Sequence, residues 1–503
     1  MFDSPIEVCR SGLLGIVLVA VTIPASAFDD PDSASTAADA RWSLVQARET
    51  RSDLRFPNAG ALAQADSPPA SPNSLSREFG DRSSYVIPAL EILGFQFLLN
   101  RYNNAFSGTD DYRVTAETIR NNLHGPWVTD NDPFSVNQFG HPYQGAMYHG
   151  FARSAGLGYW EASAYTFLGS AVWEIAGERT PPAVNDQVAS GIAGSFFGEP
   201  LFRMASLVLE NGESIWWREL FAAVISPPVG LNRLAFGDRF TPIFSSHGAS
   251  YYSRLQIGYS RTVQGTELAV NDFKRNAFIA DFSMQYGLPG KPGYDYTRPF
   301  DYFTFDVTGT SANAFDAIGT YGLLVGKSYG KGDDSYRGVW GLYGSYDYIA
   351  PQTYRISTTA LSLGTTAQWW LAQTVALQAS LLGGVGYGAV GSLRVTADND
   401  YQYGVAPQVV MLLRMIFDDK ASVDVNARDF FVRGITRNND NIARADASLT
   451  WRLYKQHAVS VKYLWTRRDS TLAILGSRAQ TVATLGLYYT YIGREGFSAV
   501  EWR

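Results

Sequence analysis

The stretch FIADFSMQY, residues 278–286, shows the pattern that decides the fold of this chain. Every second side chain in it is apolar, from Phe278 to Tyr286, and polar residues such as Asp281 and Gln285 lie between them. Successive side chains of a β-strand point to opposite faces of a sheet, so this segment has one apolar and one polar face. The alternation recurs about a dozen times from Tyr251 to the C-terminus, which predicts a half made of β-strands.

The connections between these strands favour a transmembrane barrel over a soluble sandwich. In an outer-membrane barrel, short periplasmic turns alternate with longer outer loops, and the apolar faces point into lipid. A Greek-key sandwich predicts no such alternation. Here tight connections at 371–373, 418–420 and 455–456 alternate with longer ones at 349–355, 390–401, 435–440 and 469–479.

The composition of the two faces points the same way. The face predicted to line the lumen carries Arg254, Asp281, Asp306, Asp424, Asn426, Arg428, Arg444, Asp446 and Lys462. Unpaired charges avoid dry protein interiors, so this face does not fit a soluble core. The face predicted to contact lipid carries Phe303, Phe305, Val307, Leu449, Trp451, Val459, Val461, Tyr463, Leu485, Leu487 and Tyr489. The alternative is aromatic-rich packing within a soluble β domain.

The predicted fold class is α+β: an N-terminal helical domain (85–245) followed by an antiparallel up-and-down transmembrane β-barrel of about 12 strands (246–503). Helices are expected at 87–100, 111–121, 137–156, 159–177, 185–210 and 213–225, separated by prolines. Strands are expected at 252–262, 276–287, 299–309, 317–329, 336–348, 356–370, 374–389, 402–417, 421–434, 441–454, 457–468 and 480–492.

The N-terminus predicts export. Residues 11–24, SGLLGIVLVAVTIP, are followed by Ala25-Ser26-Ala27, the pattern of a signal peptide (1–27) cleaved after Ala27. The competing interpretation is a structural helix. Residues 28–84 are rich in Ala, Ser, Asp and Pro and are predicted to form a disordered linker. No other stretch approaches about 20 uninterrupted apolar residues, so membrane residence is expected to come from strands.

The net charge argues against a nucleic-acid partner, and the cysteine content argues against disulfides and thiolate-bound metals. The formal net charge is -6 without a basic stripe, which argues against nucleic-acid binding. The single cysteine, Cys9, lies in the predicted signal peptide, so the mature chain would have no disulfide and no thiolate metal ligand. The expected partner is outer-membrane lipid, no cofactor is predicted, and the sequence does not identify a partner protein.

The densest polar pattern lies in the helical half. HPYQG (141–145), WEIAGE (173–178) and Asn185-Asp186 occur in this order, accompanied by Asn137, Glu199, Arg203, Asn232 and Arg233. Over about residues 131–233 this set resembles a bacterial family known as domain of unknown function 3943 (DUF3943). The resemblance implies a secreted envelope protein, and it implies no particular reaction.

Four of these residues are candidate catalytic groups: His141, Glu174, Glu178 and Asp186. Glu174 and Glu178 are spaced i, i+4 and share one helix face, and imidazole plus carboxylates is adequate for a metal or acid–base site. Whether a metal binds is left open. The competing interpretation is a structural polar network, in which His141 caps a helix or bonds to Glu174, and Arg203 neutralises Glu178 or Glu199. His149, outside the motif, is expected on the helix surface.

The leading functional hypothesis is an outer-membrane protein that acts as a channel, a transport component or a structural element of the envelope. Its helical domain would be periplasmic or lie within the barrel. The alternative is an enzyme that modifies an envelope lipid or polymer with His141, Glu174, Glu178 and Asp186. Convergence of these four side chains on a reachable pocket would favour the enzyme.

Overall fold

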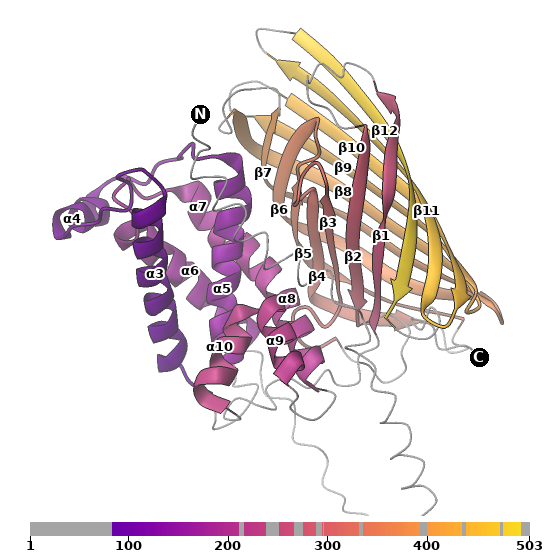
Figure 1. Cartoon of the computed structure of the whole chain (residues 1–503), viewed down its shortest axis with the longest axis horizontal. Coiled ribbons are helices and arrows are strands. Elements are labelled where there is room, and N and C mark those ends of the chain that lie inside the picture. The colour runs from indigo at the N-terminus through magenta and orange to yellow at the C-terminus, as the bar shows by residue number, and fades with distance from the viewer. Residues whose placement is uncertain are drawn as a thin grey trace, which may run out of the picture.

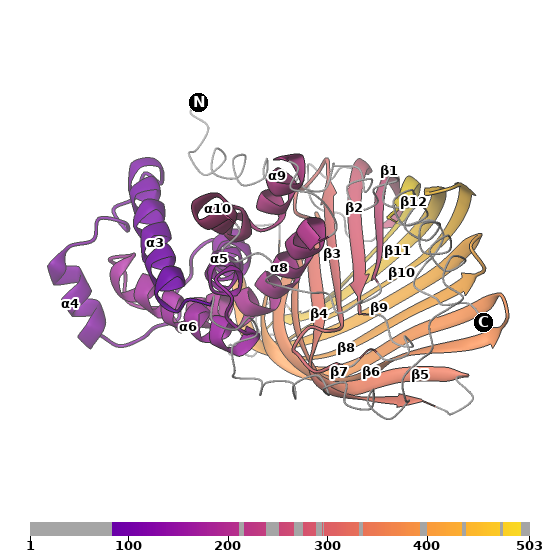
Figure 2. The same cartoon turned by 90° about the horizontal axis from the view of Figure 1, so that it is seen from below.

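A computed structural model describes residues 83–210, 216–237, 251–265, 275–287, 294, 296–330, 335–392, 400–434, 439–472 and 476–493. The predicted signal peptide, nearly all of the predicted linker and the predicted domain boundary at residues 245–246 lie outside these ranges. Within them, helices come first in the chain and strands follow, and the two groups lie side by side (Figure 1; Figure 2).

The helical half contains eight α-helices and two π-helical turns among the described residues. They are α3 (Val86–Phe106), α4 (Ala116–His124), η3 (Val136–Gly140), α5 (His141–Ser154), α6 (Tyr159–Ala176), α7 (Val184–Val188), η4 (Ala189–Ala193), α8 (Gly194–Glu210), α9 (Trp216–Ile225) and α10 (Pro227–Phe236).

Local sequence signals explain where several of these helices begin. Thr115 and Thr118 form a reciprocal capping box at the start of α4. Pro227 and Pro228, which were expected only to separate helices, occupy the first turn of α10. Proline fits there because the first helical N–H groups have no intrahelical acceptor.

A close crossing of α5 with η4 and α8 lies at the centre of the helical half. A Cβ added to Gly145 would lie 1.9 Å from the carbonyl oxygen of Ser190, and one added to Gly194 would lie 2.6 Å from the Cα of Gly145. The backbones therefore touch directly. The same crossing covers His149, which is fully buried, so its predicted surface position is wrong.

One continuous helical segment, Val184–Leu209, is long and apolar enough to cross a membrane. It is formed by α7, η4 and α8, and 83% of its most apolar 18-residue stretch is buried inside the protein. Its sequence is not an uninterrupted apolar run, because polar residues such as Asp186, Glu199 and Arg203 lie within it. Its burial is that of a core helix.

The strands form a closed antiparallel barrel in which each strand pairs with its neighbours in the chain and β1 pairs with β12. This confirms the predicted fold class. The strands are β1 (Tyr251–Gly265), β2 (Asn276–Tyr286), β3 (Phe303–Thr310), β4 (Ala317–Gly330), β5 (Tyr336–Ile349), β6 (Tyr354–Ala372), β7 (Val375–Ser392), β8 (Tyr401–Phe417), β9 (Ala421–Gly434), β10 (Asn439–Tyr454), β11 (His457–Leu472) and β12 (Gly476–Ile492).

The third strand begins four residues later than expected. Phe300 has a φ of 64°, in the left-handed region, and the Asp301 carboxylate accepts hydrogen bonds from the backbone N–H groups of Thr297 and Arg298. This local turn delays strand pairing until Phe303, which lies opposite Tyr286 of β2.

The helical half packs against the outer wall of the barrel. Phe197 of α8 stacks on Phe305 of β3 and contacts Tyr346 of β5, and both of these alternate with lumen-facing residues on their strands. Phe303, Phe305 and Val307, which the sequence predicted to face lipid, are therefore at most 6% exposed. On the far wall the predicted outward residues are open, as Leu487 at 60% illustrates. The described contacts of the helices thus lie outside the lumen.

Candidate functional site

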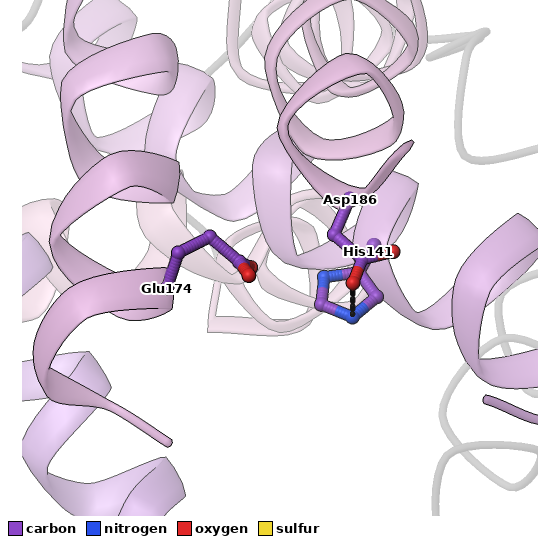
Figure 3. Close-up of side chains that lie close together, drawn as sticks. All are labelled: His141, Glu174 and Asp186. Carbon is purple, nitrogen blue, oxygen red and sulfur yellow. Dashed lines mark ion pairs between the residues drawn. The ribbon is translucent and has the colours of Figure 1, made fainter. Parts of the chain in front are cut away.

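Three of the four candidate catalytic residues converge inside the helical half. His141 is the first residue of α5, Glu174 lies in the last turn of α6, and Asp186 lies in the first turn of α7. One donor atom from each lies within 4.8 Å of the others, and His141 Nε2 is 3.7 Å from Asp186 Oδ2. Both carboxylates point towards the imidazole ring (Figure 3). All three residues are at most 4% exposed.

One atom of each of these side chains is held by a neighbour outside the trio. Glu174 Oε2 accepts a hydrogen bond from the N–H of Ala183, at 2.9 Å, whereas the buried Oε1 has no partner. His141 Nδ1 lies 3.3 Å from the hydroxyl of Ser190. Asp186 Oδ1 accepts a hydrogen bond from the Asn185 amide at 2.9 Å, which leaves Oδ2 towards the ring.

Glu178 does not join this group, although it lies one turn after Glu174. Its carboxylate accepts hydrogen bonds from the indole N–H of Trp173, at 2.8 Å, and from the hydroxyl of Thr180, at 3.3 Å. The predicted quartet is therefore a trio, His141, Glu174 and Asp186, which we call the trio below.

Burial dominates the electrostatics of the trio. It raises the pKa of Glu174 to about 8. Burial, reinforced by the nearby carboxylate of Asp130, also raises the pKa of Asp186 well above its usual range. Within the described part of the chain, neither carboxylate forms an ion pair with an Arg or Lys. Among the residues that the structure describes, the two buried carboxylates thus share His141 as their basic neighbour.

The asparagines of the motif connect the trio to the barrel. Asn137 and Asn185 both donate to Asp130, at 2.6 and 2.7 Å, and Asn185 also donates to the hydroxyl of Tyr403 on β8, at 3.0 Å. The sequence analysis did not single out Asp130 or Tyr403. More than 200 residues separate Tyr403 from the motif, so no local spacing could indicate the contact.

A second buried network surrounds Glu199 on α8. Its carboxylate accepts hydrogen bonds from Arg153 and Arg203, each at 2.8 Å, and lies 3.0 Å from His149 Nε2. Arg203 also pairs with Asp301 of the β2–β3 connection at 3.2 Å. Arg203 therefore neutralises Glu199 and not Glu178. Although burial opposes ionisation, the two guanidinium groups hold the pKa of Glu199 well below its usual range.

The last two motif residues lie near the end of the helical half. The amide of Asn232 donates to the hydroxyl of Ser154 at 2.5 Å, which fixes α10 against α5. Arg233 pairs with Glu219 of α9 at 3.1 Å near the surface. Neither residue touches the trio, so both have local structural contacts.

The barrel lumen is the other candidate site, and ion pairs cross it. Arg428 on β9 donates to Asp347 on β5 at 3.0 Å and lies 3.7 Å from Asp306 on β3, six strands away around the barrel. Arg254 on β1 pairs in the same way with Asp424 on β9, at 3.1 Å. Side chains from opposite walls therefore meet in the middle of the lumen.

Apolar clusters lie on both sides of these charges. Towards the longer loops, buried inward residues form one cluster: Ile349, Tyr354, Ile356, Val390, Ala406, Phe430, Val432 and Ile442. Towards the tight turns, a second cluster consists of Tyr252, Ala376, Ile416, Ala458 and Ile492. Each of these residues lies on the same face of its strand as the polar lumen residues, because side chains alternate between the two faces of a strand. The lumen thus has a charged layer between two apolar layers, and a cavity of about 100 Å³ remains within the charged layer beside Arg254, Asp281 and Lys462.

One family model matches the part of the chain that carries the polar motif. Residues 126–228 match the family model described as Domain of unknown function (DUF3943). The helical half contains a DUF3943 domain. This confirms the resemblance inferred from HPYQG, WEIAGE and Asn185-Asp186. The match ends before Asn232 and Arg233, which the sequence analysis had included.

Solved structures with some likeness to this chain are outer-membrane channels and porins. They include the channel DcaP of Acinetobacter baumannii (TM-score 0.23, 8% identity, 49% of this chain and 98% of that one), the NanC porin (0.24, 6%, 47% and 98%) and the KdgM porin (0.21, 8%, 48% and 98%). At these TM-scores they add nothing to the closed barrel that the strand pairing itself establishes. No curated protein matches the chain.

The DUF3943 domain therefore holds both buried networks. His141 and Asp186 of the trio lie on the same crossed segments as the Glu199 network, α5 and α7–α8, and Glu174 lies on α6. Asn185 beside the trio and Arg203 of the Glu199 network both contact residues of the barrel half. A polar motif of this family is, in this chain, partly a set of docking contacts.

Proposed function

We propose that this protein is a bacterial outer-membrane barrel with a closed lumen that serves as a structural scaffold for its DUF3943 domain. The observation that carries the proposal is Arg428, which bridges Asp347 and Asp306 across the lumen. A porin-like channel needs a water-filled passage between opposite walls. Here opposite walls are joined at that level, and apolar layers lie above and below.

The exposed wall supports a membrane location. Large apolar side chains project outward from the strands that the helices leave open, and they include Leu449, Trp451, Val461, Leu487 and Tyr489, all between 43% and 60% exposed. A continuous wall of this kind is stable in contact with hydrocarbon and costly in water. The helical half also exposes apolar side chains on α3, such as Leu90, Leu93, Phe97 and Leu98, which would contact the lipid beside the barrel.

Planar-bilayer recording tests the closed lumen. We expect refolded protein to show no stepwise current, because among the described residues ion pairs join opposite walls of the lumen and apolar layers lie on both sides of them. Flotation of the same preparation with liposomes serves as the control for insertion. Stepwise current from protein that floats with the lipid would overturn the scaffold proposal and restore the channel hypothesis.

For the enzyme hypothesis, the structure brings three of the four candidate residues together, but all three are buried. With exposures of 2–4%, the trio can meet a lipid or polymer substrate only after the DUF3943 domain opens. The geometry therefore supports the scaffold better than an enzyme acting in this conformation.

A further inference from the structure

We propose that His141, Glu174 and Asp186 bind one divalent transition-metal ion, of which Zn²⁺ is the representative case, between α5, α6 and α7. This site is independent of whether the lumen conducts, and nothing in the scaffold proposal requires it.

The spacing of the trio fits a bridging ion better than direct hydrogen bonds. The distance from His141 Nε2 to Asp186 Oδ2, 3.7 Å, is too long for a hydrogen bond. Two ligands that each lie roughly 2.0–2.2 Å from a tetrahedral zinc ion are about 3.4 Å apart. The trio spans at most 4.8 Å, so a small closing movement of the side chains would complete three ligand positions.

The free atoms of the trio are the ones a metal would use. Glu174 Oε1 is buried without a hydrogen-bond partner, and leaving such an atom uncompensated is costly. The opposite atom of each side chain is held in place, by Ala183 for Glu174, Ser190 for His141 and Asn185 for Asp186. Hydrogen bonds of this kind orient metal ligands and fix the tautomer of a coordinating histidine.

The trio also lacks the arginine partners that the second buried network has. Glu199, on α8, is buried as deeply as the trio but is compensated by Arg153 and Arg203. Among the described residues, neither Glu174 nor Asp186 pairs with an Arg or Lys. A divalent cation would supply the positive charge that arginines supply at Glu199.

The donor set indicates the kind of metal. One imidazole and two carboxylates suit Zn²⁺ and its neighbours among the first-row metals, whereas Ca²⁺ prefers six to eight oxygen ligands and Mg²⁺ keeps most of its water. Three protein ligands leave a fourth position for water, as in many zinc sites. At 2–4% exposure that position would be screened from bulk solvent.

Metal titration of the refolded full chain in detergent tests the site. After treatment with a chelator and its removal, we expect the protein to take up one Zn²⁺ per chain, measured by elemental analysis and by competition with a chromogenic chelator. His141→Ala, Glu174→Gln and Asp186→Asn should each weaken binding by at least about 10- to 100-fold, the size of effect seen even for residues that only support metal ligands. Matched controls are His124→Ala, an exposed histidine on α4, and Glu161→Gln, at the opposite end of α6 from Glu174; both should bind like the wild type.

Two further measurements keep the test decisive. Heat-modifiable migration in gels confirms that each variant retains a folded barrel. The visible absorption spectrum of Co²⁺-loaded protein reports which ligands bind the metal. Glu174→Gln should therefore change this spectrum even if the variant folds fully. No zinc uptake by folded wild-type protein, or equal uptake by the trio variants and the controls, would overturn the site. Uptake of Ca²⁺ without Zn²⁺ would overturn the choice of metal. None of these results depends on bilayer conductance, so this proposal and the scaffold proposal can fail separately.

Discussion

Replacing Glu199 with glutamine is expected to destabilise the DUF3943 domain by about 3–5 kcal/mol, because it removes the negative charge that two fully buried guanidinium groups share. Arg153 and Arg203 both donate to this carboxylate, and all three side chains are 0% exposed. Arg203 also pairs with Asp301, so the loss should loosen the contact between α8 and the barrel. Chemical unfolding followed by circular dichroism at the helix band measures the change in free energy of unfolding.

The pair Arg233 and Glu219 provides a matched control for Glu199. This ion pair has a similar distance, 3.1 Å, but Glu219 is 39% exposed. Glu219→Gln is expected to cost only about 0–1 kcal/mol, as is usual for ion pairs near the surface. If Glu199→Gln costs no more than this control, the buried network does not stabilise the domain.

Replacing Gly145 with alanine should have the other large effect. The new methyl group would lie 1.9 Å from the carbonyl oxygen of Ser190, and backbone cannot rotate away as a side chain can. Separating α5 from η4 to make room should cost about 3 kcal/mol, at the upper end of the range for overpacking. Because His141 and Ser190 lie on the two separated segments, the variant should also bind Zn²⁺ more weakly than wild type.

Gly94→Ala on α3 is the control for a glycine substitution in a helix. No heavy atom lies within 4 Å of the added methyl group. Alanine is about 1 kcal/mol more favourable than glycine in a helix interior, so this variant should be slightly more stable than wild type. Equal effects of Gly94→Ala and Gly145→Ala on the unfolding free energy would contradict the close crossing.

The barrel was predictable because each strand carries its own signal. The period of two, the charged inward residues and the tight turns at 418–420 and 455–456 are local features, and the structure reproduces each of them. The sequence could not predict which outward residues of the barrel lie under the helices and which stay exposed. Phe305 and Leu487 are both apolar residues at outward positions, yet one lies under α8 and the other is open. Lipid and protein favour the same residue types, so only the docked structure distinguishes them.

The candidate site was predicted in composition but only partly in geometry. The i, i+4 spacing placed Glu174 and Glu178 on one helix face. The spacing could not reveal that the indole N–H of Trp173 donates a hydrogen bond to the Glu178 carboxylate and so holds it away from the trio. His149 was misplaced because a lone histidine in a helix gives no sign of the neighbour that covers it. A signal was present in Gly145, Gly194 and Gly198, whose lack of side chains allows α8 to approach α5 directly.

Because of its layered lumen, this barrel should resemble a water-soluble globular protein more than a pore in how much apolar surface becomes hydrated when it unfolds. When a water-filled cylinder of strands unfolds, its inner surface is already hydrated, whereas here residues such as Phe430 and Tyr252 become hydrated only on unfolding. Newly wetted hydrocarbon raises the heat capacity of the unfolded state and steepens the response to denaturant. The stability curve of this protein should therefore bend more strongly with temperature than that of a hollow barrel with the same number of strands.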